Sequence, residues 1–250
     1  MKYQDIRKFS YSRDKKVLAT SYNFDINNWI KSPYTCFKVR FYIELACVFV
    51  FILQYTNIKP NHISYLYAFS GIIAGAFLGS NNNTLLIIGI FLFFSKVALD
   101  GTDGLLARVK YKPTKFGALL DDWGGLVGEY GFLFGLGLYL FNQTGNENII
   151  YITVATGFIK AIDIKTYGNR FLQNSKKFSK VKKEENLFYS FAKDLVKNGF
   201  NYHAKTVDLI LLSILYDLYL GNLYVTHYFL YIYFVRGVII FFGNLFIYRK

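Results

Sequence analysis

Two carboxylates three residues apart have a spacing suited to binding a metal ion. Asp100 and Asp103 lie in a segment that leads directly out of an apolar run, and residues i and i+3 share one face of a helix. Ionisable side chains at a membrane boundary are costly unless a partner binds them, and Mg²⁺ is typically held by carboxylates together with phosphate oxygens and water. The pair therefore predicts a divalent metal that carries a phosphorylated ligand.

Small and basic residues complete this predicted site. Gly104 and Gly117 let a neighbouring helix or a ligand approach the backbone closely, and Ala107 continues the carboxylate face as a small side chain. Arg108 supplies a planar cation suited to the oxygens of a diphosphate. Three lysines that follow it give the entrance a positive field that attracts anions: Lys110, Lys112 and Lys115.

Long apolar stretches must position these residues. The chain is 53% hydrophobic and 20% aromatic, above the apolar share of an ordinary soluble domain. Six stretches reach or approach the roughly 20 residues that one bilayer crossing needs: 62–79, 84–99, 116–141, 149–165, 206–220 and 224–247. The sequence therefore predicts an all-α integral membrane protein with six transmembrane helices in a domain over residues 58–250.

The basic residues indicate how this domain is oriented. The net charge of +13 would also suit a nucleic-acid binder, but the Lys and Arg residues cluster in the links between apolar runs, so we expect no nucleic-acid partner. The positive-inside rule places these links in the cytoplasm. An even number of crossings then puts both termini and the Asp100 motif on the cytoplasmic side.

A seventh apolar run, 41–55, tests this topology. It is short for a span, carries Glu44 and Gln54, and follows a segment rich in Lys and Arg that the positive-inside rule keeps in the cytoplasm. We therefore predict a cytoplasmic N-terminal extension, residues 1–57, that ends in an interfacial helix. A seventh transmembrane span is the alternative.

The motif resembles the signature of the CDP-alcohol phosphotransferase family, D-x2-D-G-x2-A-R-x8-G-x3-D-x3-D. Seven of its eight fixed positions are matched, by Asp100, Asp103, Gly104, Ala107, Arg108, Gly117 and Asp121. The segment Lys59-Pro60-Asn61-His62-Ile63-Ser64 is similar to the Thr-Pro-Asn-x-x-Thr that opens the family's membrane domain. The resemblance covers about residues 58 to 248.

This resemblance implies a reaction and assigns roles to single residues. Asp100, Asp103 and Asp121 would bind one or two divalent cations, Mg²⁺ or Mn²⁺. The nucleotide pocket would contain Asn61, Asp100, Asp103, Gly104, Ala107, Arg108 and Gly117. An acceptor hydroxyl would attack the phosphorus of a CDP-activated lipid or alcohol and release CMP, as in phospholipid or related polar-lipid biosynthesis. The family also suggests a homodimer.

The last fixed position departs from the family pattern. Gly125 stands where the family has an Asp that is a metal ligand and the proposed general base. Two nearby acids could replace it: Asp122 lies about 60° around the helix, whereas Glu129 lies about 40° away and about 6 Å deeper. With Asp121 they are the candidate catalytic residues. The alternative is a catalytically weak or inactive relative that still binds CDP-linked ligand and metal.

Polar residues in the later apolar stretches predict an acceptor site. Lys160, with Asp163 and Lys165, could line the same pocket, and Arg236 could hold the phosphate of a phosphorylated acceptor. An ion pair between Arg236 and Asp208 is the alternative, because antiparallel helices would hold them at similar depth.

Overall fold

The computed structural model describes residues 1–22, 25–27, 29–30, 32–162, 187–199, 208–221 and 224–248. Within these ranges the regular secondary structure is entirely helical, as predicted. The α-helices are α1 (Tyr3–Tyr22), α2 (Pro33–Leu53), α3 (Pro60–Leu78), α4 (Asn83–Val109), α5 (Lys115–Thr144), α6 (Asn148–Ala161), α8 (Leu187–Asp194), α9 (Asp208–Leu220) and α10 (Tyr224–Tyr248). A short π-helix, η1 (Leu195–Gly199), follows α8.

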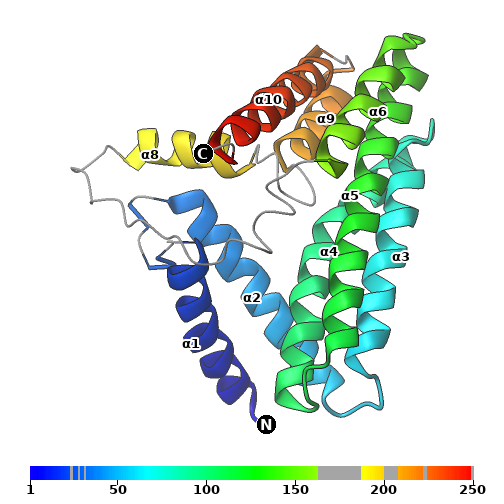
Figure 1. Cartoon of the computed structure of the whole chain (residues 1–250). Coiled ribbons are helices and arrows are strands. Elements are labelled where there is room, and N and C mark those ends of the chain that lie inside the picture. The colour runs from blue at the N-terminus through cyan, green and yellow to red at the C-terminus, as the bar shows by residue number, and fades with distance from the viewer. Residues whose placement is uncertain are drawn as a thin grey trace.

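Helices α3, α4 and α5 form the central bundle (Figure 1). Helices α3 and α5 meet through glycines, and a Cβ atom added at Gly75 would lie only 2.3 Å from the carbonyl oxygen of Gly131. Small residues at a helix interface allow this backbone contact, which gives dense packing without large side chains. Helix α6 packs on α5 and α10, and α10 packs on α9, which extends the bundle toward the C-terminal half.

Local sequence signals set where the central helices begin and end. The Asn82 side chain caps α4 by accepting hydrogen bonds from the backbone N–H groups of Thr84 and Leu85. Thr114 caps α5 in the same way through the N–H of Gly117. Helix α5 ends at Gly145, whose φ of 67° is left-handed and therefore suits glycine.

Three helical segments have the length and hydropathy for a membrane crossing: Asn83–Val109, Lys115–Thr144 and Val225–Asn244. Helix α3 has 19 residues but carries the polar Asn61 and His62 in its first turn. Helices α6 and α9 have 14 and 13 residues, short of the roughly 20 that a crossing needs. The apolar helices fit an integral membrane protein, and the six-span arrangement stays a prediction.

Several element boundaries differ from the apolar stretches that predicted them. Helix α4 continues to Val109, past the end of the predicted apolar stretch 84–99, so that Asp100 to Arg108 are helical, as the shared face of Asp100 and Asp103 requires. Helix α2 begins at Pro33, well before the predicted run 41–55. The segment before it contains a helix, α1, that apolar periodicity did not predict. Asp163 and Lys165 lie outside the described residues.

Glu44 joins α1 to α2. Its two carboxylate oxygens accept hydrogen bonds from Arg7 Nε at 2.7 Å, from the Tyr11 hydroxyl at 2.8 Å and from the Tyr3 hydroxyl at 2.9 Å. Burial alone would raise the pKa of Glu44, but these donors outweigh it and lower the pKa below its ordinary value. For Tyr11, burial and then the hydrogen bond to Glu44 raise the pKa to about 12.

The α1–α2 junction should therefore weaken in acid. Because the pKa of Glu44 is lower in the folded protein, its stabilising effect is present above the unfolded pKa and is lost as pH falls through the folded value. Glu44→Gln should lower the melting temperature at pH 7, and the difference from wild type should begin to shrink as pH falls below about 4, the ordinary Glu pKa, and disappear below the lowered folded pKa. Thermal unfolding of both proteins between acidic and neutral pH tests this prediction. A difference in melting temperature that does not depend on pH would contradict it.

Candidate active site

A pocket of about 430 Å³ lies where the first turns of α3 and α5 meet the last turns of α4. This volume is in the usual range for a small-molecule site. Seven residues predicted from the sequence line it: Asn61, Asp103, Gly104, Ala107, Arg108, Gly117 and Asp121. Residues far apart in the chain are thus brought together around one cavity.

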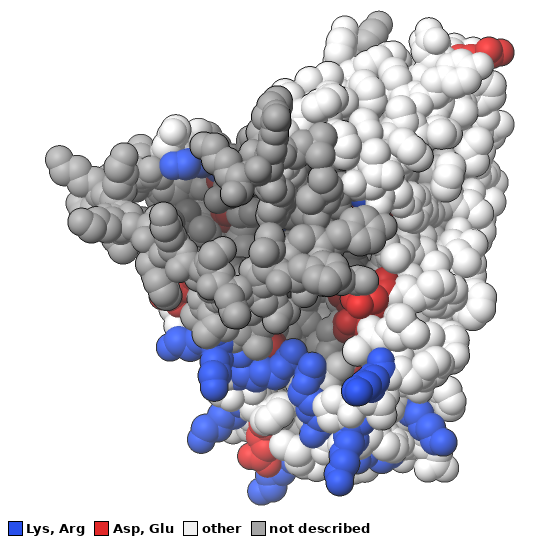
Figure 2. All heavy atoms as spheres, in the orientation of Figure 1, with Lys and Arg blue, Asp and Glu red and all other residues white. Residues whose placement is uncertain are grey.

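The pocket has the electrostatics of an anion site. The N-termini of α3 and α5 both border it, and helix N-termini carry partial positive charge and orphan N–H groups. The side chains of Lys59, Arg108 and Lys112 add full charges to the lining. Figure 2 shows Lys and Arg gathered over the lower end of the molecule, the end at which Figure 1 places the link between α4 and α5. An anionic ligand would be attracted to this end.

Two glycines allow polar side chains to lie close to the backbone in the pocket wall. A Cβ atom at Gly104 would lie 3.1 Å from Arg108 Nη1, so the guanidinium folds back over this turn of α4. At Gly117 a Cβ atom would lie 3.1 Å from Thr114 Oγ1 and 3.4 Å from Asn61 Oδ1. A Cβ atom at either position would crowd these polar groups by a few tenths of an ångström, so glycine leaves them where they are.

Helix α3 holds the two carboxylates of α4. Asp103 is buried, and Ser64 Oγ donates a hydrogen bond to its Oδ2 at 2.5 Å. The hydroxyl of Tyr67, also buried, is hydrogen bonded to Asp100. Asp100 is therefore tied to the α3–α4 interface and lies outside the pocket lining, whereas Asp103 and Asp121 reach the pocket.

The donor set fits a hard divalent cation in part. Asp103 and Asp121 offer carboxylate oxygens to the same pocket, the ligand type that Mg²⁺ and Mn²⁺ prefer. Across the described part of the chain, no three His, Cys, Asp or Glu side chains group closely enough to hold a metal by themselves. The predicted trio is thus not preassembled, and an ion here would need phosphate oxygens or water as further ligands.

Sequence reasoning missed Lys96. It is buried, with its ammonium nitrogen 3.2 Å from the carbonyl oxygen of Gly124 and 3.5 Å from the centroid of the Tyr67 ring. Its position four residues before Asp100, on the same face of α4, is the signal that could have identified it. Ser64 and Tyr67, which bond the motif carboxylates, were likewise given no role.

Glu129 and Lys160 form an ion pair away from the pocket. Both side chains are largely buried, and Lys160 Nζ also donates to the Tyr233 hydroxyl at 2.7 Å. Arg236 lies three residues after Tyr233 on α10, so it shares that face of the helix. Asp122 is exposed on α5. None of the predicted residues Glu129, Asp122, Lys160 and Arg236 lines the pocket.

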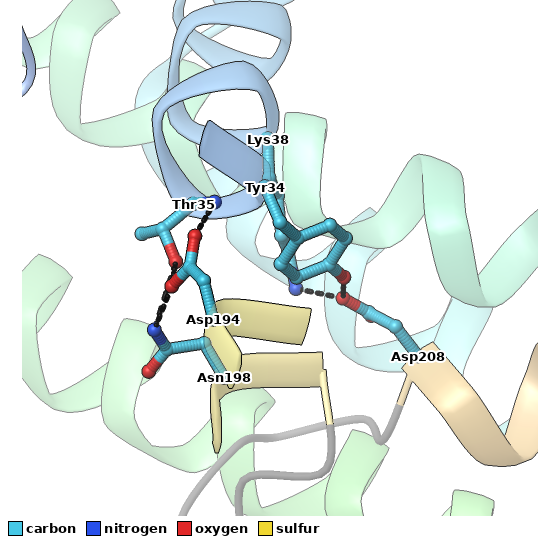
Figure 3. A network of polar contacts seen from close by, with 6 residues as sticks. All are labelled: Tyr34, Thr35, Lys38, Asp194, Asn198 and Asp208. Carbon is cyan, nitrogen blue, oxygen red and sulfur yellow. Dashed lines mark hydrogen bonds and ion pairs between the residues drawn. The ribbon is translucent and has the colours of Figure 1, made fainter. Parts of the chain in front are cut away.

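Asp208 bonds to α2 instead of to Arg236. One of its carboxylate oxygens accepts hydrogen bonds from the Tyr34 hydroxyl and the Lys38 ammonium (Figure 3). In the same view, Asp194 accepts from the backbone N–H and the hydroxyl of Thr35, both at 2.7 Å. The first turns of α2 are thus fixed to α8 and α9, and the alternative Asp208–Arg236 pair is not formed.

Comparison with known proteins agrees with the motif and the pocket. A family model described as CDP-alcohol phosphatidyltransferase matches residues 57–234, a range that contains every residue lining the pocket. A search of curated proteins gave no significant match. Since the family match covers well over half of the sequence, the chain belongs to the CDP-alcohol phosphatidyltransferase family.

Proposed function

We propose that this protein transfers a substituted phosphate group from a CDP-activated lipid or alcohol to a hydroxyl acceptor and releases CMP. One observation carries the proposal: six of the seven matched motif residues, all but Asp100, line a single pocket that is bordered by two helix N-termini. Family membership supports phosphotransfer from a CDP-alcohol in lipid synthesis. The pocket would hold the nucleotide and its diphosphate.

The lining suggests how the donor is bound. The diphosphate would lie against the first turns of α3 and α5, with Arg108 on its oxygens. Asn61 and Gly117 would border the nucleoside, because both line the pocket and the Asn61 side-chain oxygen lies close to the backbone of Gly117. Asp103 and Asp121 would hold Mg²⁺ or Mn²⁺. That cation would supply Lewis-acid stabilisation of the charge that develops on the departing CMP.

The acceptor hydroxyl needs a base within reach. Of the three candidate acids, Asp121 lines the pocket, Glu129 is paired with Lys160, and Asp122 is exposed. We therefore propose that a carboxylate oxygen of Asp121 accepts the proton of the acceptor hydroxyl. Lys160 and Arg236 remain proposed contacts for a phosphorylated acceptor that enters from the side of α6 and α10.

The membrane setting is part of the same proposal. Six crossings, with α2 lying at the interface, would place the termini, the basic links and the pocket in the cytoplasm. The donor would then reach the pocket from the inner leaflet. A homodimer is also proposed, on the family resemblance.

A second candidate function rests on Gly125. The family motif has an Asp there, so the chain could bind CDP-linked ligand and metal with little or no turnover. CMP release separates the two candidates. Purified protein with Mg²⁺ or Mn²⁺, CDP-diacylglycerol or a soluble CDP-alcohol, and a panel of hydroxyl acceptors should release CMP. Thermal stabilisation by CDP without CMP release for any pair would favour the inactive relative.

Glu129 should matter for stability more than for turnover. Glu129→Gln leaves the Lys160 ammonium without its anion in a largely buried setting, and breaking a buried pair typically costs about 3–5 kcal/mol. We expect a clearly lower melting temperature and CMP release within about threefold of wild type. Glu129→Gln combined with Lys160→Met should recover much of the loss. A fall in turnover of about 100-fold at an unchanged melting temperature would instead identify Glu129 as the base.

A further inference from the structure

Lys96 reaches a position that the fold keeps open for it. A Cβ atom at Gly128 of α5 would lie 2.1 Å from Lys96 Cε and 2.2 Å from its Nζ, and one at Gly71 of α3 would lie 2.9 Å from Cε. Any larger residue at either glycine would displace the lysine side chain. The stem therefore passes between two glycines on opposing helices, and only 2% of the residue is exposed.

The ammonium lies beside the position at which the motif lacks its last acid. It is bonded to the carbonyl oxygen of Gly124, the residue immediately before Gly125. At 100° per residue, positions 125 and 128 of α5 are about 60° apart, so an acid at 125 would be on the neighbouring part of this surface. The chain thus brings a buried cation next to the helix turn where the family pattern has a metal-binding carboxylate.

A link through Tyr67 connects this cation to the carboxylates. The ammonium is 3.5 Å from the centroid of the Tyr67 ring, and the hydroxyl of the same ring is hydrogen bonded to Asp100. A cation over an aromatic face is stabilised most when both are desolvated, as they are here. Lys96 and Asp100 are also one turn apart on α4.

We propose that the Lys96 ammonium takes the place of a second metal ion, so that the site binds a single divalent cation. Asp103 and Asp121 at the pocket, together with Asp100 behind Tyr67, carry three negative charges, and the Lys96 ammonium reduces this to two. One divalent ion held by Asp103 and Asp121 neutralises the remainder without help from an acid at 125. Lys96 is then a positioning residue, acting on Asp100 through Tyr67. This inference rests on the proposed function, because it assumes that the pocket holds CDP with a metal.

The number of bound ions tests this directly in the wild-type protein. Detergent-purified protein, saturated with CDP, is titrated with Mn²⁺, and free Mn²⁺ is followed by electron paramagnetic resonance. We expect one Mn²⁺ per chain. Two ions per chain, or none, would overturn the proposal, and this measurement needs no variant that folds.

Two variants test whether Lys96 is the reason that one Mn²⁺ ion binds per chain. Gly125→Asp alone should stay at one ion, because the new carboxylate would pair with Lys96. Lys96→Met combined with Gly125→Asp removes the ammonium and supplies the fourth acid, so it should bind two ions. The matched control is Lys8→Met, which removes an exposed lysine of α1 outside the pocket lining and should stay at one. A double variant that folds and still binds one ion contradicts the replacement of a metal by Lys96.

CMP release by the wild type is measured separately. CMP release together with two bound ions would refute the single-ion inference and leave the proposed function intact. One bound ion without CMP release for any donor and acceptor would support the inference and count against the proposed function.

Discussion

Asp103→Asn should lower the rate of CMP release by about 10³-fold, equivalent to about 4 kcal/mol of transition-state stabilisation. Asp103 is buried, lines the pocket and faces it together with Asp121, so the substitution removes one of the two carboxylates proposed to hold the ion there. Asn keeps the shape of Asp and can still accept the hydrogen bond from Ser64. The variant should therefore fold, and its thermal stabilisation by CDP should no longer depend on Mn²⁺.

Glu147→Gln is the matched control for this prediction. It removes an exposed acid at the start of α6, at the opposite end of α5 from the pocket, and should release CMP at the wild-type rate. A folded Asp103→Asn protein with activity within about tenfold of wild type would show that Asp103 does not hold a catalytic metal.

Gly75→Ala should destabilise the protein by at least about 3 kcal/mol. The added Cβ would lie 2.3 Å from the carbonyl oxygen of Gly131, and backbone atoms cannot move aside as a flexible side chain can. Helices α3 and α5 would have to separate along their shared surface. Because the pocket uses the first turns of both helices, nucleotide binding should weaken as well. Thermal unfolding and CDP binding in detergent measure both effects.

Gly243→Ala provides the comparison for this effect. Gly243 is also a helical glycine, but among the described residues no atom beyond its chain neighbours and its own helix backbone lies within 4 Å of the Cβ that alanine would add. Since alanine favours helix over glycine by up to about 1 kcal/mol, this variant should be as stable as wild type or slightly more stable. Equal losses at both positions would mean that contact between α3 and α5 is not what makes Gly75 necessary.

The pocket was largely predictable because its chemistry is local in sequence. Asp103, Gly104, Ala107 and Arg108 follow helical spacing on α4, and Gly117 and Asp121 continue the pattern on α5. The motif could not show that Tyr67 holds Asp100 outside the lining, because that contact depends on how α3 packs against α4. The spacing of residues in the sequence shows which side chains share a helix face, but the residues that this face contacts depend on how the helices pack.

Lys96 illustrates the same limit. Its place in an apolar run was visible, but its contacts with Gly124, Gly128 and Tyr67 come from two other helices. Glu129 was predicted as a substitute base from its position on α5 relative to residue 125. Its pairing with Lys160 depends on how α6 packs against α5, which no periodicity encodes.

The sequence predicted that the apolar helices exist better than it predicted where they begin and end. Hydropathy identified α4, α5 and α10, which the structure gives as segments able to cross a membrane. It did not locate the end of α4, because Asp100 and Asp103 lower the local hydropathy although the helix continues through them. Helix α1 is rich in charged residues, and its few apolar side chains, such as the buried Ile6, form no long apolar run in the sequence. Its packing on α2, through Ile6 and Glu44, was therefore not predicted.

Helix α5 carries both Asp121 at the pocket and Glu129 in the cluster with Lys160 and Tyr233. Every residue that lines the pocket comes from the continuous stretch 59–121, whereas Lys160 and Tyr233 belong to later helices. Under the proposed assignment, the residues that bind the nucleotide and those that bind the acceptor belong to different halves of the chain, joined by α5. Substitutions in the second half would then change the acceptor without altering the residues that line the pocket, provided that α5 keeps its register between the two halves.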